Sequence, residues 1–277
     1  MPELPEVETV RRIIGPQVKG QTVLSVQVFN EKVIAYPDRD TFASSLCGKT
    51  ITAVGRRGKY LLFPLDNGDR LFLHLRMTGQ LLVTPKDHPM EKHTHFAADL
   101  SSGKQLRYAD VRRFGRFWYL KKDEPDGITG ADKLGPEPDD PKLTASYLKE
   151  KLGGKMNPIK EMLHDQSVVA GIGNIYSDEI LFASGIYPGK KCCCLTDAEW
   201  SILAEKIPET IAYYTEKNAI SPEDYLKSQG KDYRNTPYLK VYGKSGEPCP
   251  VCGTILSGTR VRGRSSVYCT KCQPDRS

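Results

Sequence analysis

The chain has 277 residues, of which 39% are hydrophobic, and a formal net charge of +6. This length is sufficient for two domains of ordinary size. No run of about eighteen apolar residues occurs, and the N-terminus lacks the basic and apolar regions of a secretory signal, so we expect a soluble intracellular protein and exclude a membrane-spanning one. Residues 228–277 contain nine Lys or Arg residues and three acidic ones. A basic segment of this kind fits nucleic-acid binding or a solvated tail.

Residues 3–18 are predicted to form a helix. Pro5 is tolerated in a first helical turn, and apolar residues recur at spacings of three and four as far as Ile14. Glu3 and Glu6 suit the positive end of the helix dipole. Taken alone, the two glutamates are therefore interpreted as compensating that dipole.

The sequence pattern changes over residues 21–120, where short runs of apolar or alternating apolar and polar residues follow one another. Turn signals such as Asp66-Asn67-Gly68 separate these runs. Closely spaced strands with such turns predict an antiparallel sandwich or barrel, and we assign residues 1–125 to this N-terminal domain. The runs are TVLSVQVF, ITAVG, KYLLFPL, RLFLHL, QLLV, HFAADL, KQLRY and RFWYL.

A segment rich in Pro, Gly and Asp follows, and we place a linker at residues 126–142. Beyond it the pattern turns helical, in LTASYLKEKL, NPIKEML, NIYSDEILFASG and TDAEWSILAEKI, and we assign residues 143–235 to a helical domain. Residues 219–240 are expected to be irregular.

Two helix starts are predicted within this helical domain. Thr196 and Glu199 have the spacing of a capping box. Asn157 and Pro158 are expected as the N-cap and first residue of another helix.

The last segment contains two Cys-x-x-Cys pairs that are separated by sixteen residues. This spacing is typical of a structural zinc site with four thiolates, since each turn presents two sulfurs to one ion. Two disulfides are the alternative, which a reducing compartment disfavours. We therefore predict one structural Zn²⁺, with no open position for catalysis, in a zinc module over residues 236–277. The predicted ligands are Cys249, Cys252, Cys269 and Cys272.

Between the pairs, Arg260, Arg262 and Arg264 alternate, and Gly263 is available for a turn. This pattern predicts a hairpin that presents arginines either to phosphates or to solvent. A zinc scaffold would hold them rigidly, which favours phosphate binding.

Six segments, in order and with compatible spacing, resemble the formamidopyrimidine-DNA glycosylases, bacterial base-excision enzymes for oxidised purines. The resemblance covers essentially the whole chain. It implies an α+β multi-domain fold, with an N-terminal helix plus antiparallel β-sandwich, a helical helix-two-turn-helix domain and a C-terminal zinc-finger β-hairpin. The segments are MPELPEVETVRR, RRGKYLL (56–62), HLRMTG (74–79), DVRRFG (110–115), VVAGIGNIYSDEILF (168–182) and the cysteine module with GRSSVYCTKCQ.

The resemblance implies that Pro2 is the catalytic nucleophile, exposed as a secondary amine when Met1 is removed. Such an amine attacks C1′ of the damaged nucleotide and displaces the base. The resulting iminium then promotes strand cleavage by β,δ-elimination. Glu3 is implied as the acid/base that protonates the opening sugar ring, and Glu6 supports it.

Two basic residues complete the implied catalytic set. Lys59 contacts the lesion nucleotide and assists elimination, whereas Arg264 binds phosphate and donates a proton late in elimination. From the pattern alone, Lys59 is a solvated strand end and Arg264 faces solvent.

An enzyme that attacks C1′ must take the nucleotide out of the base stack. The resemblance implies that Met77 wedges into the stack, Phe114 stacks on a base and Arg112 hydrogen-bonds the orphaned partner base. From residue type alone, Met77 is expected to fill space in the core, Phe114 to be an aromatic residue of the core and Arg112 to be a charged surface residue. The resemblance implies four further DNA contacts, at His93, Lys155, Lys160 and Asn174. Asn174 opens an expected helix, and a helix start suits phosphate.

The implied partner is double-stranded DNA containing oxidised bases or abasic sites. We expect a monomer in the bacterial cytoplasm, associated with the nucleoid and without membrane contact. The alternatives are a sibling enzyme for oxidised pyrimidines and a catalytically silent zinc-containing DNA-binding protein; MPELPE and RRFG favour the purine enzyme. Residues 215–235 depart from the family pattern around the lesion-binding loop, which leaves lesion preference open. The run Cys192–Cys194 has no counterpart in the resemblance and is expected to be surface thiols, in preference to the alternative of a redox or metal role.

Overall fold

The computed structural model describes residues 2–275, which form two compact units. The first unit contains the chain up to Asp132 together with Asn218–Arg234. The second contains Lys133–Lys217 and the chain from Asn235 onward. The predicted removal of Met1 concerns a residue outside the described range.

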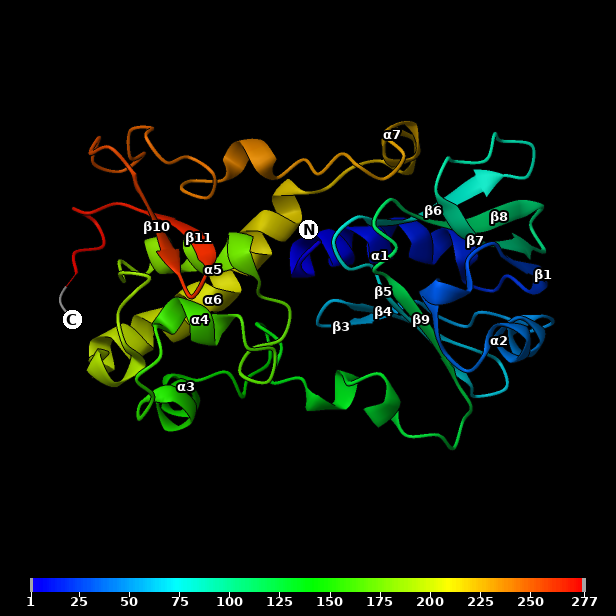
Figure 1. Cartoon of the computed structure of the whole chain (residues 1–277), viewed down its shortest axis with the longest axis horizontal. Helices are drawn as coiled ribbons and strands as arrows, with labels where there is room; N and C mark the ends of the chain where they lie inside the picture. Colours follow the sequence, from blue (N-terminus) through cyan, green and yellow to red (C-terminus); the bar gives the residue numbers. More distant parts are fainter. Residues whose placement is uncertain (1, 276–277) are drawn as a thin grey trace. The chain divides into compact units, whose positions relative to one another are not determined.

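The first unit combines helix α1 (Leu4–Val18) with two β-sheets (Figure 1). The strand orders are β1-β7-β8-β6 and β2-β9-β5-β4-β3. All neighbouring strands are antiparallel except β2 and β9, which run parallel. The strands are β1 (Val23–Val28), β2 (Ile34–Tyr36), β3 (Gly55–Arg57), β4 (Tyr60–Pro64), β5 (Arg70–His74), β6 (Gly79–Pro85), β7 (Thr94–Leu100), β8 (Lys104–Asp110) and β9 (Arg116–Leu120).

The predicted antiparallel sandwich is confirmed by one apolar core that takes side chains from both sheets and from α1. Phe96 of β7 and Phe117 of β9 meet there with ring centroids 4.9 Å apart. Helix α1 packs against β3, β4 and β6, and its predicted apolar face is buried. The helix is also tied to β3 by an ion pair of 3.3 Å between Glu8 and Arg56.

Two short elements of this unit differ from the sequence expectations. Helix α2 (Arg39–Leu46) was not predicted, although Asp38 caps it by accepting the N–H of Asp40 and Thr41. Conversely, the run ITAVG forms no strand before Gly55; Ile51 makes only an isolated bridge to Leu65. The 3-10 turns of this region are η1 (Glu31–Val33), η2 (Asp126–Ile128) and η3 (Ala131–Lys133).

The segment Asn218–Arg234 was assigned from sequence to the helical domain, whereas its contacts group it with the first unit. It contains α7 (Pro222–Lys227), which packs against β6, within a stretch expected to be irregular. Tyr225 of α7 joins the apolar core of the sandwich at 2% exposure. The Asn218 amide donates to the Thr9 hydroxyl of α1 at 2.9 Å. Burial and this hydrogen bond therefore fix the segment on the first unit.

The second unit is helical, as predicted. The capping box at the start of α6 is confirmed, because Thr196 N–H donates to Glu199 at 2.7 Å and Glu199 N–H donates to Thr196 Oγ at 3.2 Å. Helix α4 begins one residue later than predicted, with Pro158 as its N-cap. Within residues 2–275, no helix is both long and apolar enough to cross a membrane. The helices are α3 (Ala145–Leu152), α4 (Ile159–Leu163), α5 (Asn174–Ala183), η4 (Cys192–Cys194), α6 (Asp197–Lys217) and η5 (Thr236–Tyr238).

The C-terminal hairpin of this unit pairs β10 (Ser257–Val261) with β11 (Arg264–Tyr268). Its two turn residues, Arg262 and Gly263, both have positive φ, at 48° and 81°. This is the pattern of a type I′ turn, whose twist matches that of the strands. The glycine singled out in the sequence therefore lies in the turn, and Arg264 opens the strand that follows.

Candidate active site

Pro2, Glu3 and Glu6 all lie at the start of α1 and are all buried. Glu3 is 1% exposed and is the N-cap residue of the helix. Its N–H donates to the carboxylate of Glu6 at 2.8 Å, which is one half of a capping box. Carboxyl groups are rarely buried to this extent unless they have partners or a chemical task. The hydrogen bond to Glu6 therefore fixes the backbone of Glu3, the residue next to Pro2.

Lys59 lies in the two-residue turn between β3 and β4 and is 8% exposed. Gly58 takes φ 54° at the first central position, as a type II′ turn requires. Arg56 of β3 pairs with Glu8 of α1, so this turn is held near the first turns of the helix. Lys59 is therefore buried, not a solvated strand end.

His74, at the end of β5, was not singled out from the sequence. Its ring packs edge-on against Tyr60, with centroids 4.7 Å apart, and its Nδ1 accepts the N–H of Arg76 at 3.0 Å. Burial, together with the positive charges of Arg76 and Lys59, lowers the pKa of His74 from 6.5 to about 3. A neutral histidine thus lies within electrostatic reach of Lys59. Its position in HLRMTG, three residues before Met77, is the only signal in the sequence that could have identified it.

The structure brings Met77, Arg112 and Phe114 together from two loops of the first unit. The Arg112 guanidinium lies 4.7 Å from the centre of the Phe114 ring, and its Nη1 lies 2.9 Å from the Met77 sulfur. Met77 is 40% exposed and Phe114 is 46% exposed. Apolar side chains of this size are normally buried in a core. Neither residue is the core filler that its type alone indicates.

Asp110 accepts hydrogen bonds from both loops, and it was not singled out from the sequence. One carboxylate oxygen accepts the Thr78 hydroxyl and the Arg112 N–H, and the other accepts the Gly115 N–H at 2.9 Å. Burial opposes ionisation, but these hydrogen bonds outweigh it and lower the pKa of Asp110. Its own N–H donates to the carbonyl of His93 at 3.0 Å, which places the predicted His93 beside the same loops.

The backbone of both loops is constrained as well. Arg76 and Arg113 each take φ 58°, in the left-handed region that non-glycine residues rarely adopt. Gly115 is required for a different reason: a Cβ there would lie 1.6 Å from the Tyr108 hydroxyl. Residues held in unfavourable conformations are concentrated at functional sites. These loops therefore present Met77 and Phe114 in a fixed arrangement.

In the second unit, Arg264 and Lys155 line one cavity of about 390 Å³. Both side chains are exposed. The cavity is also lined by Asn157, Met162, His164 and two carboxylates, those of Glu161 and Asp165. The two cations offer charge-assisted contacts to an anion such as phosphate, which the two carboxylates partly offset.

Lys160 has a different environment from the one predicted. Its ammonium is 1% exposed and pairs with Asp178 at 2.7 Å, while donating to the carbonyl of Ser265 at 2.6 Å. Asp178 also accepts the Ser266 hydroxyl and the Val267 N–H. Burial raises the pKa of Asp178, against the opposing effect of Lys160. This burial does not suit a direct phosphate contact; the pair instead fastens α4 and α5 to strand β11.

Asn174 is the first residue of α5, as the sequence predicted. Its amide nitrogen lies 3.4 Å from the Ser265 hydroxyl, next to Arg264 in the hairpin. Its Oδ1 is buried and has no hydrogen-bond partner within the described residues. This oxygen is an acceptor and does not itself suit phosphate; the groups that suit phosphate here are the backbone N–H groups at the start of α5.

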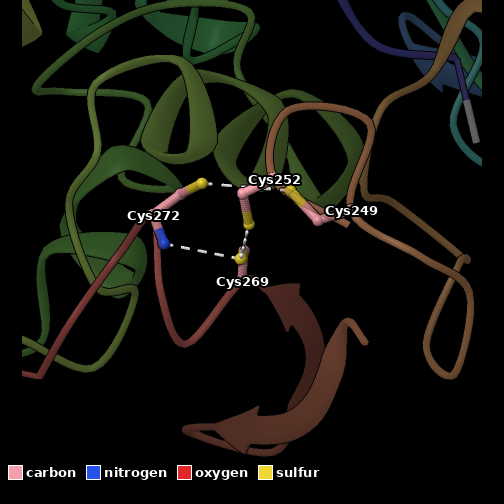
Figure 2. A group of neighbouring side chains, drawn as sticks. All are labelled: Cys249, Cys252, Cys269 and Cys272. Carbon is pink, nitrogen blue, oxygen red and sulfur yellow. Dashed lines mark hydrogen bonds between the residues drawn. The ribbon is translucent and has the colours of Figure 1, made fainter. Parts of the chain in front are cut away.

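The four predicted cysteine ligands converge on one point (Figure 2). All four sulfurs lie within 4.8 Å of one another, and the Cys249–Cys272 and Cys252–Cys269 separations are 3.9 and 3.5 Å. Zn–S bonds of about 2.3 Å place the sulfurs of a tetrahedral site about 3.8 Å apart. The site fits one structural Zn²⁺. Four thiolates fill its coordination sphere, so the ion's role is to build the fold.

Comparison with known proteins gives three family matches that follow one another along the chain. They are the Formamidopyrimidine-DNA glycosylase N-terminal domain over residues 1–117, the Formamidopyrimidine-DNA glycosylase H2TH domain over residues 134–224, and the zinc finger found in FPG and IleRS over residues 246–274.

Relatives of known name and structure match over the full length. The formamidopyrimidine-DNA glycosylase of Desulforamulus reducens is 42% identical over 274 residues, which cover 99% of both chains. The Lactococcus lactis FPG in complex with Fapy-dG-containing DNA superposes with a TM-score of 0.90 at 35% identity, covering 99% of this chain and all of that one. The wild-type Lactococcus lactis FPG with oxidised-pyrimidine-containing DNA gives a TM-score of 0.91 at 35% identity, with the same coverage.

Proposed function

Since the chain belongs to the formamidopyrimidine-DNA glycosylase family, we propose that Pro2 is its nucleophile and that oxidised purines are its principal substrates. The chain is a DNA glycosylase of base excision repair, and its family combines this activity with lyase activity at abasic sites. The observation that carries the residue assignment is the buried group of Pro2, Glu3 and Glu6 at the start of α1.

The reaction begins when the Pro2 nitrogen attacks C1′ of the damaged nucleotide. The glycosidic bond breaks, the base leaves with a proton, and the sugar ring opens as Glu3 delivers a proton to the ring oxygen. The product is an iminium between Pro2 and C1′. Glu6 acts as a positioning residue, because its carboxylate holds the Glu3 N–H at 2.8 Å.

Elimination follows because the iminium withdraws electrons from C2′. Loss of a C2′ proton expels the 3′ phosphate, and a second elimination expels the 5′ phosphate. We assign Lys59 to the lesion nucleotide and to the first elimination, and Arg264 to a phosphate and to proton donation in the second. The burial of Lys59 and the open cavity beside Arg264 support these roles.

DNA binding uses groups from both units. Arg264 and Lys155 provide positive charge at their shared cavity, and the start of α5 at Asn174 offers backbone N–H groups to phosphate. Met77 and Phe114 fill the gap that the extruded nucleotide leaves, and Arg112 hydrogen-bonds the base left opposite. The exposed contact between Arg112 and Phe114 supports this assignment.

A second substrate class, oxidised pyrimidines, has specific support in a relative. The similar Lactococcus lactis protein has been solved with DNA that contains an oxidised pyrimidine. We therefore propose that oxidised pyrimidines are secondary substrates. The place of action is the bacterial cytoplasm at the nucleoid, where duplex DNA is found.

The test is borohydride trapping. The zinc-loaded chain is mixed with duplex DNA that carries one 8-oxoguanine opposite cytosine, and the cross-linked residue is mapped by mass spectrometry. We expect the cross-link at Pro2, with Met1 absent. Glu3→Gln should lose trapping on 8-oxoguanine but keep it on DNA with a preformed abasic site, since that substrate needs no base removal. A cross-link at a lysine, or none with either DNA, would overturn the assignment of Pro2.

A further inference from the structure

The run Cys192–Cys194 lies beside the segment that carries Lys155. Backbone hydrogen bonds join the two: Cys192 N–H donates to the Asn157 carbonyl and Cys193 N–H to the Lys155 carbonyl, both at 3.0 Å. Cys192 is buried, whereas Cys193 and Cys194 are exposed. The fold therefore holds two neighbouring thiols at the surface, on a 3-10 turn whose position is fixed by its neighbour.

A third sulfur completes this group. The Cys193 Sγ lies 3.8 Å from the Cys194 Sγ and 3.4 Å from the Sδ of Met156. Met156 is 63% exposed, although methionine is normally a core residue. The separations are in the range of the zinc cysteines, which lie 3.5 and 3.9 Å apart in pairs. Cys193 thus has two sulfurs, those of Cys194 and Met156, at separations that ligands of one metal ion adopt.

We propose that Cys193, Cys194 and Met156 form a binding site for one soft monovalent metal ion of the copper(I) class. Thiolate and thioether sulfur select such ions, whereas zinc prefers thiolate, imidazole and carboxylate. Binding releases two thiol protons and adds one positive charge, so the site changes from neutral to a net charge of −1. No change of oxidation state is required.

The location gives the site a consequence for DNA binding, which rests on the proposed role of Lys155. A bound ion links Met156 to the cysteine run and so restrains the backbone that carries Lys155. It also places a negative charge beside a residue that lines the cavity with Arg264. Repulsion between this added negative charge and the DNA phosphates should weaken DNA binding about twofold to fivefold at low ionic strength.

The experiment titrates copper(I), under anaerobic conditions and from a coloured chelator, into the zinc-loaded full chain while an indicator dye reports released zinc. We expect the first equivalent to bind without zinc release. The double variant C193S/C194S should lose that equivalent, and Met156→Leu should weaken it at least tenfold. Cys47→Ser removes an exposed cysteine of the other unit and should behave as wild type.

Two results would overturn the proposed site: copper uptake that is unchanged in C193S/C194S, or a first equivalent that displaces zinc in the wild type. DNA affinity is then measured with and without one equivalent of copper(I), using an undamaged duplex. An unchanged affinity, with uptake intact, would refute the coupling to Lys155 and leave the metal site. Neither result depends on the assignment of Pro2, which the trapping experiment tests separately.

Discussion

The buried pair of Lys160 and Asp178 allows a quantitative prediction. The two side chains are 1% and 0% exposed, and Asp178 accepts hydrogen bonds from Lys160, Ser266 and Val267. Removing one member leaves the other charge buried without its partner, which costs about 3–5 kcal/mol. Lys160→Met should therefore lower the free energy of unfolding of the second unit by that amount. Replacing both, in K160M/D178L, removes both charges and should restore most of the loss.

The unfolding of each unit can be followed separately by tryptophan fluorescence, because the chain has two tryptophans, one in each unit. In a Trp118→Phe background, the fluorescence of the buried Trp200 reports urea unfolding of the second unit. The matched control is Lys149→Met, which breaks an exposed ion pair of 2.6 Å with Asp197 and should cost at most about 1 kcal/mol. If Lys160→Met cost no more than this control, or if the double variant were as unstable as both single changes added together, the reasoning would be refuted.

Four further predictions concern the zinc site, Asp110, Lys59 and His74. Cys249→Ala or zinc chelation should abolish lesion-DNA binding, because the hairpin loses its scaffold; full binding by metal-free protein in a filter assay would contradict this. Asp110→Asn should weaken discrimination of damaged from undamaged duplex by about tenfold or more, because the amide keeps only one acceptor oxygen and turns an NH2 donor toward groups that themselves donate; equal discrimination in competition assays would count against it. Lys59→Ala should slow single-turnover base removal more than it weakens affinity, and an unchanged rate would exclude the role. His74 binds a proton below about pH 6.5 when unfolded but only below about pH 3 when folded, so the free energy of unfolding should fall as pH falls through that window, and His74→Asn should flatten this dependence in urea titrations.

The elements that the sequence predicted well have local causes. The helix at the N-terminus follows from apolar spacing and from Pro5, and the capping box of Thr196 and Glu199 is a short-range contact. The zinc ligands follow from the spacing of the Cys-x-x-Cys turns, which brings four sulfurs together. In each case the interacting groups are close in sequence or are held by a known coordination geometry.

The features that were missed depend on contacts between distant residues. The burial of Lys160 is created by Asp178 and by the backbone of β11, which lie far along the chain. The return of Tyr225 to the sandwich core and the parallel pairing of β2 with β9 likewise have no local signal. His74 could not be recognised because its neutral state results from burial and from the nearby charges of the folded unit.

The contact between Glu3 N–H and Glu6 has a thermal consequence. The hydrogen bond that starts α1 is also the one that fixes the backbone next to the proposed nucleophile. Helix ends that are exposed to solvent fray before the helix interior melts, but this first turn is buried, since Leu4, Glu6 and Val7 are at most 4% exposed. Its opening would expose apolar residues of the sandwich core and should therefore require a free energy close to that of unfolding the first unit. Heat should accordingly abolish catalysis and unfold the first unit in one transition, without an earlier loss of the proposed reactive amine.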